Sequence, residues 1–152
     1  MFRRPDPWLA GSLLVGALFL LVNLGDRNGR LWQDEAETAF LAKNILQYGY
    51  PRATDGVNRL NPSIPLAAGE AWTYHPWLSF YMTAVSFKLL GTGTAAARLP
   101  FAAMGVLCIW LFYRVVRRLT GDRSLARWSA FLLVTSVPFL LHMRQCRYYA
   151  PS

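Results

Sequence analysis

The sequence has few cysteines and no repeated pattern. Only two cysteines occur among its 152 residues: Cys108 lies inside an apolar run and Cys146 near the end of another. Two isolated cysteines define no metal-ligand spacing, and their positions imply no disulfide. The sequence also contains no internal repeat and no low-complexity tract. We therefore expect both cysteines to be small membrane-embedded residues.

Acidic residues are scarce as well. The chain has 8 of them against 16 Lys and Arg, which gives a formal net charge of +8. A basic excess alone could indicate a nucleic-acid partner, but these cations cluster at the ends of apolar runs rather than on one polar face. Hydrophobic residues make up 54% of the chain and the mean hydropathy is +0.22, both high for a soluble domain. The composition predicts an all-α integral membrane protein that contacts the lipid bilayer and binds no nucleic acid.

Three apolar segments are long enough to cross a bilayer with their flanking turns. They are residues 8–25, 98–116 and 127–146. Arg3 and Arg4 precede the first segment and place the N-terminus in the cytoplasm. A cleaved signal peptide is the alternative for this segment, but Val22-Asn23-Leu24-Gly25 lacks a small-x-small cleavage site. The sequence therefore favours three transmembrane helices in a multi-pass protein of the cell membrane.

The connection between the second and third segments carries the strongest charge bias in the chain. It contains Arg114, Arg117, Arg118, Arg123 and Arg127, opposed only by Asp122. The positive-inside rule places this connection in the cytoplasm. A fourth apolar stretch, residues 77–90, is short, carries Lys88 and would move these arginines outside if it crossed the membrane. We therefore expect it to be an interfacial helix.

This topology has a consequence for the outer face. Residues 26–97 form a long extracytoplasmic loop, and the third transmembrane helix ends on the same side. Arg144 to Tyr149 should therefore emerge on the face that carries Asp34 and Glu35.

The outer loop begins with an amphipathic pattern over residues 34–48. Gly49 is a plausible C-terminal stop for this helix, and Pro51 prevents its continuation. We expect the helix to lie on the membrane surface. Residues 51–65 are rich in Pro, Asn, Asp and Gly, which is typical of irregular loop.

The acidic residues at the start of this helix have two interpretations. Asp34 is a good N-cap, and Glu37 three residues later completes a variant of the capping box. The other interpretation is a carboxylate held at the membrane surface as a general base or metal ligand. A cap and a base can be different residues of one turn, so both interpretations stay open.

Several strings, in this order, resemble the amino-terminal portion of the GT-C glycosyltransferases, in the protein O-mannosyltransferase and aminoarabinose-transferase-like group. They are Trp32-Gln33-Asp34-Glu35-Ala36, Ala42-Lys43-Asn44-Ile45-Leu46, His75-Pro76-Trp77-Leu78, Ser86-Phe87-Lys88-Leu89-Leu90-Gly91 and Ala97-Arg98-Leu99-Pro100. Members of this group are several times longer and have many more membrane helices. The resemblance thus implies that residues 1–152 are the amino-terminal part of such an enzyme, inactive alone.

The resemblance implies an activity and a set of site residues. Such enzymes move a sugar from a polyprenyl-phosphate donor to an acceptor hydroxyl on the extracytoplasmic face, with inversion. Asp34 occupies the position of the catalytic base, and Glu35 that of a helper or cap. His75 and Arg147 are candidates for contact with the donor phosphate, although each also suits an ordinary role at the interface.

The resemblance leaves the cofactor and the acceptor open. Some relatives use a divalent metal, but an acid that commonly precedes the His75 position in one branch is Tyr74 here, and the chain offers no adequate ligand set. The sugar, the lipid chain and the acceptor are not specified by the sequence. Two other classes stay open: a small non-catalytic membrane subunit that binds a partner through its outer loop, and a transporter fragment. A transporter predicts polar residues near the midplane, and residues 106–112 offer none beyond Cys108.

Overall fold

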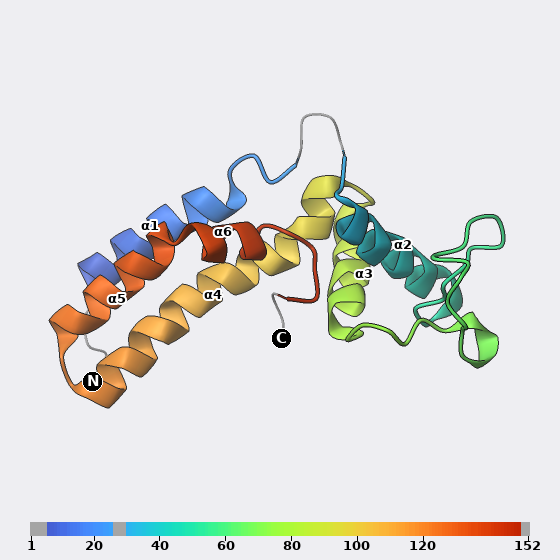
Figure 1. The fold of residues 1–152 in the computed structure, drawn as a ribbon. Coiled ribbons are helices and arrows are strands. Elements are labelled where there is room, and N and C mark those ends of the chain that lie inside the picture. The colour runs from blue at the N-terminus through green and yellow to red at the C-terminus, as the bar shows by residue number, and fades with distance from the viewer. Residues whose placement is uncertain (1–5, 26–29, 150–152) are drawn as a thin grey trace.

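The fold is a bundle of long helices with a smaller helical unit at one end (Figure 1). The computed structural model describes residues 6–25 and 30–149, so Arg3, Arg4 and Asp26 lie outside the described part. Its helices are α1 (Pro7–Leu21), α2 (Gln33–Tyr48), the short 3-10 helix η1 (Ala68–Glu70), α3 (Leu78–Leu90), α4 (Thr94–Thr120), α5 (Arg123–Thr135) and α6 (Val137–Met143). The described residues include no strand, which confirms the all-α class.

Helices α1, α4 and α5 pack side by side and bury small and branched residues between them. Leu20, Ile109, Ala130 and Val134 are fully buried in this core. Leucines, valines and tryptophans cover the outside of the same helices, among them Leu14, Leu107, Trp128 and Leu132. A bundle that is apolar on its exposed faces suits a lipid environment.

Only α4 is long and apolar enough to cross a bilayer by itself, among the helices of residues 6–25 and 30–149. Its 27 residues correspond to about 40 Å of helix. Helices α5 and α6 meet the same criteria only as a pair, with a bend of 64° between them. Helices α1 and α3 are apolar but shorter.

The bend between α5 and α6 differs from the single helix predicted over residues 127–146. Helix α5 ends at Thr135, and α6 begins with Val137 and Pro138. Proline has no N–H with which to continue the hydrogen-bond ladder, and its ring displaces the preceding turn. Pro138 is therefore the local reason why the helix is broken at Ser136.

The smaller unit consists of α2, α3 and the loop between them. Leu41 and Ala42 of α2 pack against Phe80 and Ala84 of α3 in a buried cluster. Helix α2 ends at Gly49, whose φ of 86° lies in the left-handed region, as the sequence predicts. Its start differs from the predicted cap at Asp34 and Glu37, because the N-cap residue is Trp32 and the carboxylate of Glu35 accepts from the Trp32 N–H at 3.1 Å.

A hydrogen bond beside a proline in α4 joins the two units. Pro100 lies inside α4 and leaves the carbonyl of Ala96 without its helical donor. The Ser86 hydroxyl of α3 donates to that carbonyl at 2.6 Å. The Ala97-Arg98-Leu99-Pro100 string therefore marks the point where α3 docks on α4.

The two ends of α1 contact different parts of the bundle. At its start, Asp6 accepts hydrogen bonds from Tyr113 at 2.8 Å and from Arg127, the last arginine of the connection from Arg114 to Arg127, which we call the arginine-rich turn. At its other end, the carbonyl of Leu24 accepts from Arg98, and that of Asn23 accepts from Arg144. The start of α1 and the arginine-rich turn thus lie at one end of the bundle, and α2 lies at the other (Figure 1).

Candidate active site

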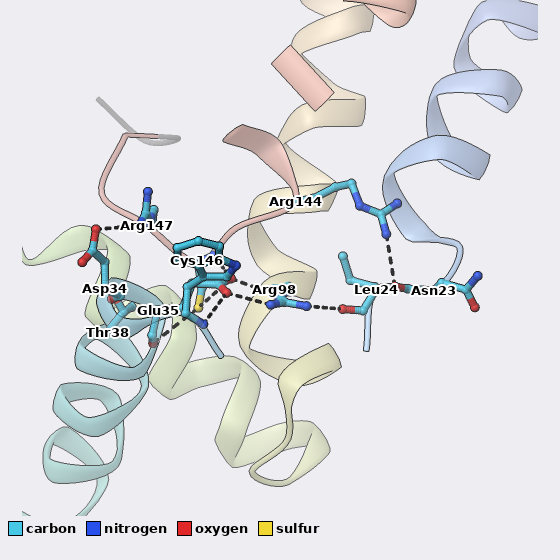
Figure 2. A network of polar contacts seen from close by, with 10 residues as sticks. Asn23, Leu24, Asp34, Glu35, Thr38, Arg98, Arg144, Cys146 and Arg147 are labelled. Atoms are coloured by element: carbon cyan, nitrogen blue, oxygen red, sulfur yellow. Dashed lines mark hydrogen bonds and ion pairs between the residues drawn. The ribbon is translucent and has the colours of Figure 1, made fainter. Parts of the chain in front are cut away.

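The start of α2 meets the segment that follows α6, although more than 110 residues separate them in the sequence. One Arg147 guanidinium nitrogen lies 2.6 Å from Asp34 Oδ2, and the Cys146 N–H donates to Glu35 Oε1 at 3.2 Å. Figure 2 shows the two pairs side by side, with Arg98 beyond them. Arg144 to Tyr149 therefore reach the neighbourhood of Asp34 and Glu35, as the sequence-based topology predicts.

Glu35 is the buried centre of this contact. Its side chain is fully buried, and Arg98 donates to both carboxylate oxygens at 2.8 and 2.7 Å. The N–H groups of Trp32 and Cys146 donate to the same carboxylate. Burial alone would raise the pKa of Glu35, but the Arg98 and backbone donors together hold it below its ordinary value. The ionised Glu35 thus joins α2, α4 and the chain after α6.

Asp34 is in the opposite environment. Its side chain is 51% exposed, and it contacts Arg147 at the surface of the protein, in the first turn of α2. The Arg147 side chain is less exposed than that of Asp34, and its Nε atom is buried without a hydrogen-bond partner among the described residues. Of the two adjacent carboxylates, Asp34 is therefore the one that a molecule in the solvent can reach.

His75 lies in the same cluster. Its Nδ1 is 2.9 Å from Glu37 Oε1, and its ring stacks on Tyr148 at 4.6 Å between centroids, with 17° between the ring planes. Burial raises the pKa of Glu37, and the nearby Asp34 charge adds to this effect, while the His75 contact opposes it. All four predicted site residues, Asp34, Glu35, His75 and Arg147, are thus brought into one cluster.

A groove of about 840 Å³ runs from this cluster along α2. Its helix side consists of Gln33, Ala36, Glu37 and Phe40, which recur every three or four residues on one face. The other side is the loop, with His75 at the end nearest the cluster. Asp34 lies beside this face, three residues before Glu37.

The sequence does not predict a site role for two residues of the cluster. Glu37, which the sequence predicts to be part of a helix cap, pairs with His75. Arg98, at the start of the second predicted transmembrane segment, holds Glu35. The available signal for Arg98 is its place at the start of an apolar run, where a charge needs a partner. Among the described residues, no group of three or more His, Cys, Asp and Glu is arranged to hold a metal ion.

Comparison with known protein families covers part of the chain, and Asp34 and Glu35 lie before the matched residues. Residues 74–148, from just before His75 to just after Arg147, match the model of the dolichyl-phosphate-mannose-protein mannosyltransferase family. No curated protein and no solved structure matches the chain. The matched segment includes α3, α4, α5 and α6. The resemblance to the GT-C protein O-mannosyltransferase group is therefore confirmed: residues 74–148 are a GT-C mannosyltransferase-like segment.

Proposed function

We propose that the chain is part of an inverting glycosyltransferase that moves a sugar from a polyprenyl-phosphate donor to an acceptor hydroxyl on the extracytoplasmic face. The observation that carries this proposal is the pairing of the half-exposed Asp34 with Arg147, next to His75. A carboxylate that faces the outside beside two basic side chains suits a reaction in which a hydroxyl loses a proton and a phosphate leaves.

The proposed reaction is a single displacement. The Asp34 carboxylate accepts the proton of the acceptor hydroxyl as the hydroxyl oxygen attacks the anomeric carbon. The bond from that carbon to the phosphate oxygen breaks on the opposite face, and the electron pair leaves with the polyprenyl phosphate. Arg147 and His75 are placed to stabilise the charge of the leaving phosphate. One displacement inverts the anomeric configuration.

In this proposal Glu35 positions the base and does not exchange protons. Its carboxylate is buried and already accepts from Arg98, Trp32 and Cys146. It fixes the first turn of α2 and the backbone next to Arg147 at the same time. Asp34 and Arg147 are then held at a defined separation by their neighbours.

The proposed membrane placement has three crossings, by α1, α4 and the bent pair α5–α6, with the N-terminus in the cytoplasm. The contact of Asp6 with Arg127 supports it, because the start of α1 then lies beside the arginine-rich turn. Since the lipid tail keeps the donor phosphate at the interface, a site at the other end of the bundle meets the donor there. The proposal assigns no role to a divalent metal.

The test uses the full-length protein, reconstituted in liposomes with membrane extract as the source of acceptor. Polyprenyl-phosphate mannose is the donor probe, because of the family match. We expect release of polyprenyl phosphate and a new glycosidic bond of the opposite anomeric configuration. Retained configuration, or transfer from a sugar nucleotide with no use of the lipid donor, would contradict the proposal.

A further inference from the structure

Apart from His75, the residues that line the groove beside the candidate active site have no role in the reaction described above. It is about 840 Å³ in volume and lies between α2 and the loop that follows it. Gln33 and Glu37 line the groove and flank Asp34 in the first turn of α2, although Asp34 itself is not among the lining residues.

The loop side of the groove is held in a fixed shape by its own hydrogen bonds. Asp55 accepts from the N–H groups of Val57 and Asn58 and from the Asn58 amide. The amide of Asn44 in α2 donates to the Arg52 carbonyl at 2.7 Å, which ties the loop to the helix. Such a groove is largely formed before any ligand arrives, and this lowers the cost of binding.

Aromatic rings line one part of the groove. Trp72 and Tyr74 have ring centroids 5.1 Å apart, and Trp72 and His75 have centroids 6.0 Å apart. Tyr74 is 46% exposed, and its hydroxyl donates to the Pro65 carbonyl, which fixes the direction of the ring. Phe40 faces the groove from α2. Trp72 is only 2% exposed, so Tyr74 is the exposed, fixed ring that can accept the flat C–H face of a sugar ring.

Planar polar groups line the rest. Asn58, Asn61 and Arg59 lie on the loop side of the groove. The Arg59 guanidinium makes no hydrogen bond or ion pair with residues 6–25 and 30–149, and the Asn61 amide nitrogen is likewise unused there. Amides and guanidinium groups present paired donors and acceptors that match neighbouring hydroxyl groups.

The same features disfavour a peptide in this groove. An extended peptide binds by adding a strand to a sheet edge, but the loop has only isolated bridges, Arg52 to Ala71 and Thr54 to Arg59, and no strand within its described residues. A helical peptide needs a continuous apolar groove, and here the Glu37–His75 pair and the amides interrupt the apolar surface.

We propose that the groove between α2 and residues 58–75 binds a saccharide chain, whose end is presented to Asp34. Its identification as the acceptor rests on the proposed function, whereas saccharide binding itself does not. Tyr74 supplies the stacking face, and Arg59 and Asn61 bind ring hydroxyls.

The test is a glycan array that also carries unglycosylated peptides, probed with the detergent-solubilised full-length protein. Two variants accompany the wild type: Tyr74→Leu, which removes the ring, and Tyr74→Phe, which keeps it. We expect the wild type to retain a subset of glycans, and Tyr74→Leu to weaken their binding about tenfold. Tyr74→Phe should bind as the wild type does.

Each other outcome overturns the inference. Retention of no glycan by the wild type, or equal retention by Tyr74→Leu, excludes a saccharide in this groove. A loss in Tyr74→Phe as large as in Tyr74→Leu makes the effect a structural one that acts through the Pro65 hydrogen bond. Binding of the peptides alone assigns the groove to a different ligand. Because the array measures binding and not sugar transfer, a failure of the proposed catalytic chemistry leaves these results unchanged.

Discussion

At the scale of residues, two adjacent carboxylates have opposite environments. Asp34 is half exposed and paired with one arginine at the surface, while Glu35 is fully buried between Arg98 and two backbone N–H groups. Neighbouring helix positions point about 100° apart, so one residue can face outside while the next faces the core. The Asp-Glu pair thus combines an accessible group with its anchor.

The Glu35–Arg98 pair should contribute much of the stability of the smaller unit formed by α2, α3 and the loop between them. Glu35→Gln or Arg98→Met leaves a buried partner unpaired, and either single change should cost about 3–5 kcal/mol. The double variant should recover part of the loss, because no buried charge then remains unpaired. Thermal unfolding in detergent measures this, with Glu70→Gln as the control, since the more exposed Arg52–Glu70 pair contributes about 0–1 kcal/mol. Equal costs for the two pairs would contradict a structural role for Glu35.

The same residue predicts a pH dependence. The pKa of Glu35 in the fold lies below its ordinary value of 4.5, so its ionised form stabilises the fold above that value. This contribution is lost as the pH falls through the lower pKa of the folded state. Between about pH 6 and pH 3, the free energy of unfolding should therefore decrease more steeply with falling pH for the wild type than for Glu35→Gln. Parallel curves would show that the Glu35 charge contributes nothing to stability.

The sequence predicts some of this site and not the rest, for a physical reason. The approach of Arg147 to Asp34 is predicted by charge bias, because the positive-inside rule predicts the side of the membrane on which each helix ends. The partners of Glu35 do not follow from any local pattern, since Arg98 is 63 residues away and Cys146 is 111 residues away. The cap assignment of Glu37 is wrong because Glu35 already reaches back to the Trp32 N–H.

At the scale of elements, the helices approach each other at glycines. A Cβ atom at Gly105 of α4 would lie 2.8 Å from a Leu20 methyl group of α1 and 2.9 Å from the Met143 Cβ of α6. Both distances are below ordinary van der Waals contact, so Gly105 permits the three helices to meet at one point.

Substitution of this glycine should therefore separate the helices. Gly105→Ala should destabilise the protein by about 1–3 kcal/mol through overpacking. Gly11→Ala in α1 is the matched control, because nothing lies within 4 Å of its added Cβ and alanine has the higher helix propensity. Thermal unfolding of both variants in detergent provides the comparison. A loss in Gly11→Ala as large as in Gly105→Ala would show that helix packing is not what Gly105 contributes.

Element boundaries differ in how well the sequence predicts them. Gly49 ends α2 as expected, because a left-handed C-cap is a local property of one residue. The bend between α5 and α6 was not predicted, since residues 128–143 carry no charge and hydropathy alone does not register the effect of Pro138. The hydrogen bond from Ser86 to the Ala96 carbonyl likewise requires the docked helices.

At the scale of the whole molecule, the proposed topology has the site and the arginine-rich turn on opposite sides of the membrane. A cysteine introduced at Val57, which is 91% exposed in the loop between α2 and α3, should react with an impermeant maleimide added to intact cells. A cysteine at Thr120, within the arginine-rich turn, should react only after the membrane is permeabilised. A background without Cys108 removes the partly exposed native thiol. Labelling of Thr120→Cys in intact cells would overturn the three-crossing topology.

The most direct test of the central claim is the rate of sugar transfer by Asp34→Asn in the full-length protein, at a saturating concentration of the lipid-linked donor. Asparagine keeps the shape of the side chain but cannot accept the hydroxyl proton, and loss of a general base lowers rates by about 10²–10⁴-fold. Its thermal stability should stay within about 1 kcal/mol of the wild type, because a surface ion pair contributes little. A fall in rate of that size with an unchanged unfolding curve supports Asp34 as the base. Near-normal transfer by Asp34→Asn would contradict it.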